Sequence, residues 1–385
     1  MRIGLCACYT NHNYGSMLQA LASELAIRQL GHDVEMVRYI KDYTLLQKAK
    51  QVPRVLNGGN IRNLRRKLER RRMSARYPEI AARRAERDAV FDGFCKRTFQ
   101  ALSEEFVGFE ALREGSKRYG AVVAGSDQLW LPAGLPTNFY NLQFAAEGVR
   151  RVSYATSFGV STIPWYQRGR TADYLRKIDH LSVREESGAQ ICREIAGVEA
   201  KVVVDPTLLL TAGEWRRALE DTRPVEKGYI FCYFLGANPR CREQANVLAA
   251  RTGLPIVTIP HLDDILPSDE GFGDHALYDV DPAGFVSLIR HAEYVLTDSF
   301  HGTVFSTLNH KRFQTFYRFA QGDGQSRNSR VDSLLGRLHL ESRLNCEGGV
   351  AVDAIDELVD FDEVDDLLAA WRADSWQFLE EALVD

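Results

Sequence analysis

Four short apolar runs between residues 119 and 204, at 119–125, 151–155, 180–183 and 201–204, each end directly in polar residues. The polar clusters that follow them are Ser126-Asp127-Gln128, Thr156-Ser157, Arg184-Glu185-Glu186 and Asp205-Pro206-Thr207. Apolar runs of this length, separated by helical patterns, are typical of buried parallel strands. Since ligands bind beyond the carboxyl ends of such strands, we expect the four clusters to meet along one edge of a sheet.

The order strand, polar loop, helix, strand occurs once near the start of the chain and again in its second half. The first copy covers 3–9, 11–15, 16–30 and 34–39, and the second covers 227–236, 239–251 and 255–259. At 385 residues the chain exceeds what one hydrophobic core usually supports. We therefore predict an α/β fold with two Rossmann-like lobes facing a cleft, resembling the GT-B glycosyltransferase architecture.

The same patterns suggest where the parts of the chain begin and end. We expect an N-terminal lobe over 1–210, a connection over 211–225, a C-terminal lobe over 226–345 and a C-terminal helical segment over 346–385. The amphipathic stretch 364–383 in that segment carries Trp371 and Trp376, which we expect to pack in a core.

A basic helical insertion is expected within the N-terminal lobe, over about 54–100, where arginine is concentrated in 62–72. Its charge can belong to a solvated helix face, or to a surface that contacts anionic lipid headgroups or a diphosphate-bearing acceptor. Aromatic residues are not interleaved with these arginines, as base stacking would require, so we expect no nucleic acid partner. The small formal net charge of −4 agrees with that expectation.

Cysteine usage and hydropathy indicate a cytoplasmic protein. The seven cysteines are scattered without the spacing of a metal site, which predicts reduced thiols. No stretch approaches the roughly 20 apolar residues that cross a bilayer. The N-terminal apolar run is also too short for a signal peptide. Membrane contact is therefore expected only as peripheral contact at the inner membrane face.

Five short motifs occur in a fixed order along most of the chain. They are Asn13-Tyr14-Gly15 with Leu18-Gln19, Gly125-Ser126-Asp127-Gln128-Leu129-Trp130, Ser182-Val183-Arg184-Glu185, Asp205-Pro206-Thr207 and Thr297-Asp298-Ser299-Phe300-His301-Gly302. Together they resemble the polysaccharide pyruvyl transferase family. The resemblance implies an enzyme that moves the enolpyruvyl carbons of phosphoenolpyruvate onto two sugar hydroxyls, forming a pyruvate ketal in an exopolysaccharide or another cell-surface glycan. It implies no metal and no organic cofactor. The acceptor can be lipid-linked, nucleotide-linked or polymeric.

His301 is the expected catalytic residue. Phosphoenolpyruvate has a carboxylate and a phosphate, and its methylene carbon must receive a proton. A histidine between a strand end and a helix start combines an anion-favouring helix terminus with a proton that transfers near neutral pH. The alternative is a structural histidine. The expected donor-binding residues are Arg184, Ser299, Phe300, Gly302, Thr303, Lys311 and Arg330.

Ser299 departs from the pattern of the family. Better-studied members tend to have an arginine two positions before the motif histidine, and this chain has Ser299 there. Either another basic residue replaces the missing anion contact, for which Lys311, Arg312 and Arg330 are the candidates, or the donor differs.

Arg184 is expected to hold an anionic group of the donor on which His301 acts, each residue coming from one half of the chain. Its guanidinium matches carboxylate and phosphate geometry. The alternative is that neighbouring acids pair with it.

The loop before the first long helix and the loop after the run 119–125 supply the expected acceptor-binding residues: Asn13, Tyr14, Gly15, Ser16, Ser126, Asp127 and Gln128. Their alternative role is helix or turn capping. Asp205-Pro206-Thr207 is expected as a hinge between the lobes rather than as catalytic residues.

The main competing interpretation is a GT-B type glycosyltransferase that uses a nucleotide-sugar donor, because a fold does not determine chemistry. Such enzymes usually have an acidic residue in the second lobe that binds a ribose. Glu293, Asp279 and Asp281 are weak candidates for it. A second alternative, a nucleic-acid or membrane adaptor on a degenerate transferase scaffold, rests on the basic insertion alone.

Overall fold

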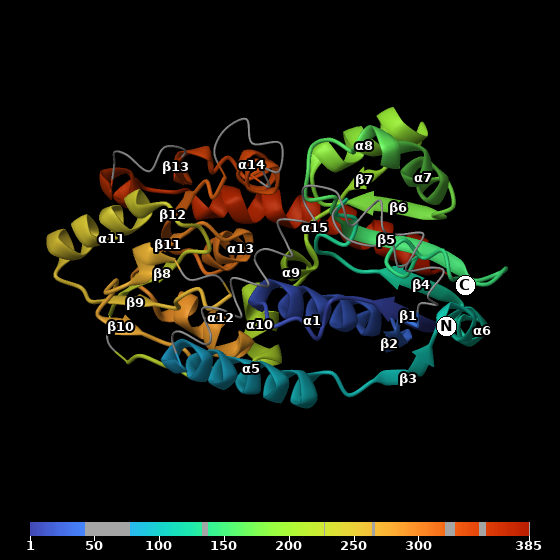
Figure 1. Cartoon of the computed structure of the whole chain (residues 1–385). Helices are drawn as coiled ribbons and strands as arrows, with labels where there is room; N and C mark the ends of the chain where they lie inside the picture. Colours follow the sequence, from blue (N-terminus) through green and yellow to red (C-terminus); the bar gives the residue numbers. More distant parts are fainter. Residues whose placement is uncertain are drawn as a thin grey trace. The chain divides into compact units, whose positions relative to one another are not determined.

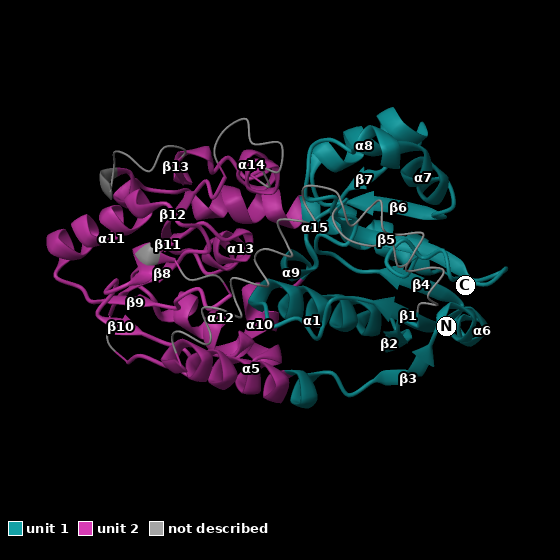
Figure 2. Cartoon of the chain, in the orientation of Figure 1, with its two compact units in different colours: residues 1–69, 95–209, 371–385 teal, residues 70–94, 210–370 magenta. Residues whose placement is uncertain are grey.

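The computed structural model describes residues 1–42, 78–132, 138–226, 228–263, 266–319, 328–345 and 352–384. The chain divides into two units, coloured separately in Figure 2. Unit 1 comprises Met1–Glu69, Cys95–Leu209 and Trp371–Asp385, and unit 2 comprises Arg70–Phe94 and Leu210–Ala370. Each unit contains one parallel sheet with helices, as Figure 1 shows. The predicted fold class, an α/β protein with two Rossmann-like lobes, is therefore confirmed.

The sheet of unit 1 has seven strands in the order β3-β2-β1-β4-β5-β6-β7, and every neighbouring pair is parallel. The central strands are buried along almost their whole length, which explains why they read as continuous apolar runs. The strands are β1 (Arg2–Cys6), β2 (Asp33–Ile40), β3 (Leu102–Val107), β4 (Ala121–Ala124), β5 (Arg150–Thr156), β6 (His180–Val183) and β7 (Lys201–Val202).

Helices pack on this sheet. One hydrophobic cluster joins the sheet to three of the helices, and Leu112, Leu175 and Cys192 contribute to it. Tyr154 of β5 lies outside that cluster and contacts Phe378 of the C-terminal helix, with ring centroids 6.3 Å apart. The helices of unit 1 are α1 (Tyr14–Gln29), α6 (Phe109–Ser116), α7 (Trp165–Leu175), α8 (Glu186–Ala196), α9 (Pro206–Leu209) and the second half of α15 (Phe361–Leu383).

Unit 2 has a six-stranded parallel sheet in the order β10-β9-β8-β11-β12-β13. Its strands are β8 (Ile230–Tyr233), β9 (Ile256–Thr258), β10 (His275–Ala276), β11 (Tyr294–Thr297), β12 (Arg312–Phe316) and β13 (Leu344–Asn345). Its helices include α10 (Ala212–Ala218), α11 (Pro239–Thr252), α12 (Pro282–His291), α13 (Phe300–Leu308) and α14 (Ser329–Arg337), with 3-10 turns η1 (Pro267–Asp269), η2 (Glu341–Arg343) and η3 (Val352–Asp356).

Aromatic side chains fill part of the core of unit 2. Phe285 of α12 contacts Phe231 and Tyr233 of β8 edge-on. Phe305 of α13 contacts Phe285, and Trp215 of α10 lies against Phe305 with ring centroids 5.2 Å apart. Helices α10, α12 and α13 are thereby joined to the central strand β8 through ring contacts.

The boundaries of the two units differ from the boundaries that we expected from the sequence. The chain passes from unit 1 to unit 2 after Leu209, so 211–225 belongs to unit 2. This segment contains α10, and Thr211 and Glu214 form a capping box at the N-terminus of that helix. The chain returns to unit 1 within α15, where Trp371 donates to the carbonyl of Val202 and Ser375 accepts from the N–H of Val204. Trp371 is buried, as expected.

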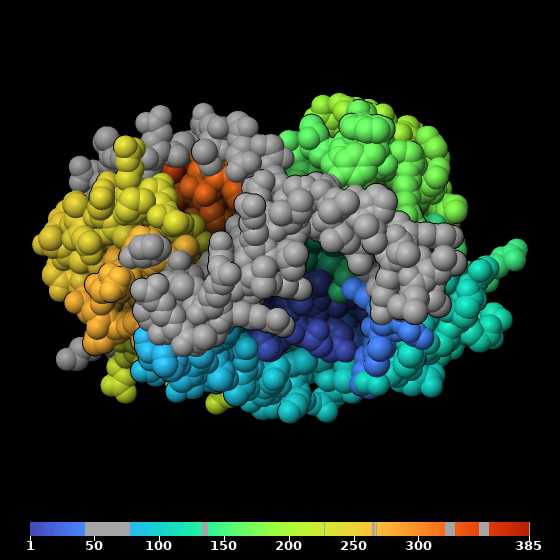
Figure 3. All heavy atoms as spheres, in the orientation of Figure 1, coloured from blue at the N-terminus to red at the C-terminus, as the bar shows by residue number. Residues whose placement is uncertain are grey.

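The described part of the expected basic insertion is α5 (Pro78–Thr98), most of which belongs to unit 2. Its exposed side is visible in Figure 3. Arg84 donates to the carbonyl of Leu262, and Arg87 pairs with Asp88 and Asp263 at 2.8 and 3.2 Å. Residues 54–77 lie outside the described residues. None of the helices in the described ranges is long and apolar enough to cross a membrane.

Candidate functional site

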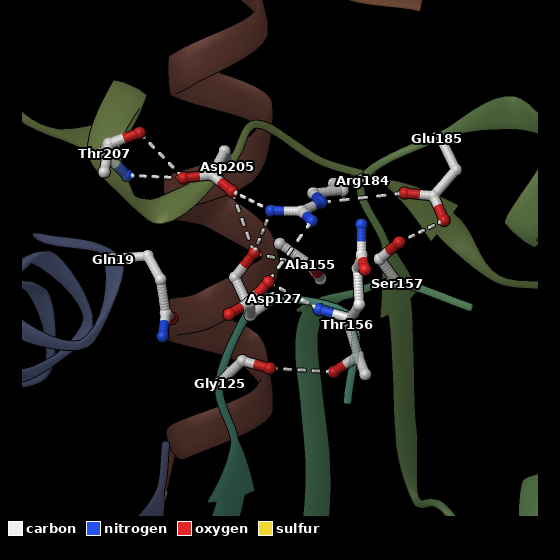
Figure 4. A network of polar contacts seen from close by, with 12 residues as sticks. Gln19, Gly125, Asp127, Ala155, Thr156, Ser157, Arg184, Glu185, Asp205 and Thr207 are labelled. Atoms are coloured by element: carbon white, nitrogen blue, oxygen red, sulfur yellow. Dashed lines mark hydrogen bonds and ion pairs between the residues drawn. The ribbon is translucent and has the colours of Figure 1, made fainter. Parts of the chain in front are cut away.

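The four strand ends that the sequence singled out meet at one edge of the sheet of unit 1. Strands β4, β5, β6 and β7 are neighbours in that order, and all are parallel. The Ser126 hydroxyl, beyond β4, donates to the Ala155 carbonyl at 3.0 Å and to the Asp205 carboxylate at 2.9 Å. Figure 4 shows the resulting network. The expected meeting of the polar clusters is confirmed.

Arg184 lies at the centre of this network, and its side chain is only 1% exposed. Its Nη1 lies 2.6 Å from Asp205 Oδ2, while Glu185 and Asp127 approach the guanidinium within 3.7 and 3.9 Å. Burial lowers the pKa of Arg184, but the three carboxylates together raise that pKa above its ordinary value. A donor anion would have to compete with Asp205 for this cation. The geometry therefore favours the alternative in which acids pair with Arg184.

Asp205 also fixes the start of α9. Its Oδ1 accepts hydrogen bonds from the Thr207 N–H and hydroxyl at 3.1 and 2.7 Å, while its Oδ2 accepts from Arg184 and Ser126. The side chain of Asp205 is fully buried. Both oxygens are thus committed inside unit 1. The motif that we expected as a hinge is held by four hydrogen bonds in this unit.

Asp127 connects the buried network to the surface, since 22% of its side chain is exposed. Its Oδ2 accepts from the Ser16 hydroxyl at 2.5 Å, and its Oδ1 accepts from the Gln128 N–H. Asp127 has a φ of 84° and Ala155 has a φ of 52°, values that residues other than glycine rarely adopt. Such strained backbone concentrates at functional sites.

The expected acceptor-binding residues come together around Asp127, but several have structural roles. Asn13 caps α1 through the N–H of Ser16, as the capping alternative proposed. Tyr14, Gly15 and Ser126 are buried, and the Gln128 side chain packs against Gly159. Asn13, Asp127 and Gln128 are therefore the members with exposed surface.

Sequence reasoning missed Cys8 and Tyr140, which lie beside this group. The Cys8 thiol donates to the Tyr140 hydroxyl at 3.3 Å. Burial, with the Asp127 carboxylate in addition, raises the pKa of Cys8 to about 12, so the thiol is neutral. Tyr140 lies far along the chain in a loop, and no motif in the sequence marks it.

His301 lies in the first turn of α13, directly beyond the carboxyl end of β11 in unit 2. His301 is buried, with 8% of the residue exposed. Its ring packs edge-on against the ring of Phe300, with ring centroids 5.2 Å apart. The first N–H groups of a helix lack intrahelical partners and favour an anion. The expected position of this histidine between a strand and a helix is confirmed, whereas its catalytic role stays a prediction.

Residues flanking His301 build the turn. Ser299 is the N-cap of α13 and accepts from the Gly302 N–H at 3.3 Å. A Cβ on Gly302 would lie 2.5 Å from Thr297 Oγ1, so glycine allows the helix to approach the strand. Thr303 is buried and bonds Thr315 of β12 at 2.8 Å. The structure thus assigns structural roles to three of the expected donor-binding residues.

Asp298 ties the ends of two strands together. Its carboxylate oxygens accept the backbone N–H groups of Leu235 and Gly236, both at 2.7 Å, just beyond β8. Burial raises the pKa of Asp298, although nearby Arg318 and the two N–H groups act in the opposite direction. The carboxylate therefore holds the edge of the sheet in place.

The basic candidates lie at different edges of this sheet. Arg330, in the first turn of α14, lies over the Phe300 ring at 5.5 Å and is therefore close to His301. Lys311 precedes β12 and donates to the carbonyl of Ala292, which precedes β11. It therefore lies at the amino edge, opposite to His301. The expectation that Lys311 binds the donor in place of the missing arginine is therefore wrong, because the strand register places Lys311 at the other edge of the sheet.

The described part of the chain contains no cluster of three or more His, Cys, Asp or Glu side chains that could hold a metal ion.

Two parallel α/β units, each with polar and charged side chains at the carboxyl edge of its sheet, define a protein of the two-lobed Rossmann-like class. The family model of polysaccharide pyruvyl transferase matches residues 13–317, which is most of the chain. The chain belongs to this family and is a transferase, which confirms the resemblance seen in the sequence. No curated protein matches the sequence.

Several solved structures are similar to this chain at low identity. UDP-GlcNAc 2-epimerase from Methanocaldococcus jannaschii is 10% identical, with 96% of this chain and 92% of that chain covered and a TM-score of 0.49. The Neisseria meningitidis UDP-GlcNAc 2-epimerase bound to UDP-GlcNAc is 9% identical, with 100% and 95% covered and a TM-score of 0.45. The glycosyltransferase SnogD from Streptomyces nogalater is 13% identical, with 97% and 95% covered and a TM-score of 0.43.

Proposed function

We propose that this enzyme transfers the pyruvyl group of phosphoenolpyruvate to two hydroxyls of a glycan or glycan precursor, forming a cyclic ketal. The observation that carries the proposal is the position of His301. In a chain that belongs to the pyruvyl transferase family, this imidazole lies in the first turn of α13, beyond a parallel strand. A helix terminus favours the anionic donor there, and the imidazole can supply a proton.

The reaction requires two carbon–oxygen bonds to form at C2 of the donor. In the first step, His301 gives a proton to the methylene carbon while one sugar hydroxyl adds to C2 and releases its own proton. In the second step, the other hydroxyl displaces phosphate from the same carbon and loses its proton. The products are the ketal and inorganic phosphate, so no oxidant, reductant or cofactor is consumed.

Asp127 is the proposed contact for the acceptor. A partly exposed carboxylate accepts hydrogen bonds from sugar hydroxyls, and the Ser16 hydroxyl holds Asp127 in position. Asn13 is exposed and Gln128 is partly exposed, and both extend the polar surface beside Asp127. On the donor side, Arg330 over the Phe300 ring supplies a cation near His301. Arg184 stays a predicted donor contact that its own variant must test.

The decisive test is an incubation of the purified full chain with phosphoenolpyruvate and a panel of lipid-linked, nucleotide-linked and polymeric sugars. Mass spectrometry should detect a product heavier than the acceptor by pyruvic acid less one water, with phosphate released in equal amount. A parallel reaction with a chelator should proceed at the same rate. Transfer from a nucleotide-sugar panel, with no ketal from phosphoenolpyruvate, would contradict the proposal.

The glycosyltransferase alternative finds little support in the acidic residues considered for ribose binding. Glu293 is exposed directly before β11, at the amino edge of the sheet, and its N–H bonds the carbonyl of Tyr229. Asp281 is the N-cap of α12. Glu293 therefore lies opposite to the edge where ligands of parallel sheets bind. Asp281 follows β10 on the carboxyl side of the sheet, but its Oδ1 accepts the Gly284 N–H and caps the helix.

Peripheral membrane contact stays a separate prediction, because the arginine-rich stretch 62–72 of the insertion lies outside the described ranges. Co-sedimentation with anionic vesicles should fall with salt and after charge reversal of Arg65, Arg66, Arg70 and Arg71, since each well-placed basic residue contributes about 1 kcal/mol. Unchanged co-sedimentation would indicate a solvated helix face.

A further inference from the structure

If the donor is phosphoenolpyruvate, as proposed above, the anion contact that Ser299 lacks comes from another residue at the carboxyl edge of the sheet of unit 2. The Ser299 hydroxyl accepts the Gly302 N–H as the cap of α13. Lys311 and Arg312 are at the amino edge, where Arg312 donates to the Tyr294 hydroxyl at 3.3 Å. Neither residue can reach the carboxyl edge, because β12 spans five residues and each rises about 3.3 Å.

Arg318 has the required position. It follows β12, which ends at Phe316 and is paired in parallel with β11, the strand that leads into Asp298 and His301. Its guanidinium lies over the Phe319 ring at 4.9 Å, and its side chain is partly exposed. Within the described residues it makes no hydrogen bond and no ion pair.

The surroundings of Arg318 leave room for its stem and keep its charge in place. A Cβ on Gly236 would lie 2.9 Å from Arg318 Cγ and 2.8 Å from Asp298 Oδ2, so this glycine permits both side chains to approach. The two oxygens of Asp298 already accept N–H groups from Leu235 and Gly236. The carboxylate therefore lies close to Arg318 while its hydrogen bonds go to the backbone, which leaves the guanidinium donors for a ligand.

We infer that Arg318 binds an anionic group of the donor, the carboxylate or phosphate of phosphoenolpyruvate, and so replaces the arginine that this chain lacks at position 299. This inference rests on the proposed function. A planar guanidinium fits either group with two parallel hydrogen bonds. Arg318 after β12 and Arg330 at the start of α14 then supply two cations to a donor that has two anionic groups.

The test compares the full-length Arg318→Gln, Arg318→Lys and Arg312→Gln variants. Loss of a charge-assisted contact should raise the apparent phosphoenolpyruvate constant roughly 10- to 100-fold in Arg318→Gln, with turnover largely retained. Arg318→Lys should recover part of the affinity, because lysine keeps the charge but lacks the fork. Arg312→Gln, at the other end of the same strand, should leave the constant unchanged. A wild-type donor constant in Arg318→Gln would overturn the inference.

Direct binding separates this inference from the proposed function. Phosphoenolpyruvate and inorganic phosphate should each stabilise the wild-type chain against heat, and Arg318→Gln should lose that stabilisation while its unliganded melting temperature stays the same. Stabilisation that depends on Arg318 without ketal formation would contradict the proposed function and keep the anion site. Equal stabilisation of wild type and Arg318→Gln, or none in either, would overturn the anion site.

Discussion

The two parallel sheets end in edges of opposite chemical character. In unit 1, three carboxylates, Asp127, Glu185 and Asp205, surround the single guanidinium of Arg184. In unit 2, the carboxylate of Asp298 accepts backbone N–H groups, and the guanidinium of Arg318 is left for other contacts. The same architecture thus supports a cation with close ion pairs in one unit and, in the other, a cation that lies near a carboxylate but forms no ion pair with the described residues.

This difference assigns each edge a type of ligand. An edge with excess carboxylate accepts hydrogen bonds from hydroxyls and repels phosphate. An edge with a helix start and the guanidinium of Arg318 attracts anions. The chemistry therefore comes from the loops that follow the strands rather than from the sheets, as is general for this kind of fold.

Replacement of His301 should have the largest effect on activity. His301→Asn removes the proposed proton donor and should lower turnover roughly 10²- to 10⁴-fold, with donor affinity largely kept. Steady-state kinetics with varied phosphoenolpyruvate measures both. The control is His310→Asn, a surface histidine paired with Asp365 just beyond α13, which should stay within a few-fold of wild type. Full activity of His301→Asn would contradict the proposed role of His301 as proton donor, while the fold assignment would be unaffected.

Replacement of Arg184 tests whether the cation of unit 1 is structural. Arg184→Ala leaves buried carboxylates without their partner and should destabilise the protein by about 3–5 kcal/mol, measured by denaturant unfolding. Arg193→Ala, which removes a solvent-exposed ion pair with Glu199, should leave the free energy of unfolding close to that of the wild type. A higher donor constant with unchanged stability would instead support the predicted donor contact.

Asp127 tests the acceptor side of the comparison. Asp127→Asn keeps a residue that tolerates the positive φ but weakens hydrogen bonds to sugar hydroxyls. We expect kcat/KM for the acceptor to fall roughly 10- to 100-fold, with the donor constant unchanged. Asp173→Asn, on the exposed surface of α7, should match wild type in both constants. A change confined to the donor constant would reverse the assignment of the two edges.

Asp221, whose carboxylate contacts Ser287, Arg290 and His291 of α12, should give the smallest effect. Burial raises its pKa, but the Ser287 hydroxyl, His291 and Arg290 outweigh burial and lower that pKa below its usual range. A depressed carboxyl pKa stabilises the fold above the unfolded-state value of about 3.9, and the contribution is lost as pH falls through the folded-state pKa. Asp221→Asn should therefore lose at most about 1 kcal/mol at pH 7 and nothing at the lowest pH. Identical pH–stability curves for both proteins would contradict this.

Local patterns in the sequence were sufficient for the fold class and for the position of several site residues. Buried parallel strands appear as short apolar runs, and each run is followed by the residues that the strand brings to the edge of the sheet. His301 could be placed at a helix start for the same reason, because the apolar run before it and Gly302 after it are neighbours in the chain.

Only the tertiary structure decided which side chains meet. Arg184 pairs with Asp205 and Ser16 with Asp127 because parallel strands bring distant loops to one edge, and the register of those strands is not visible in local patterns. Lys311 and Arg318 lie only seven positions apart in the sequence, but β12 separates them and places them at opposite edges. The sequence by itself therefore determined the strands and the types of residue at their ends, while strand order and register determined which of those residues can act together.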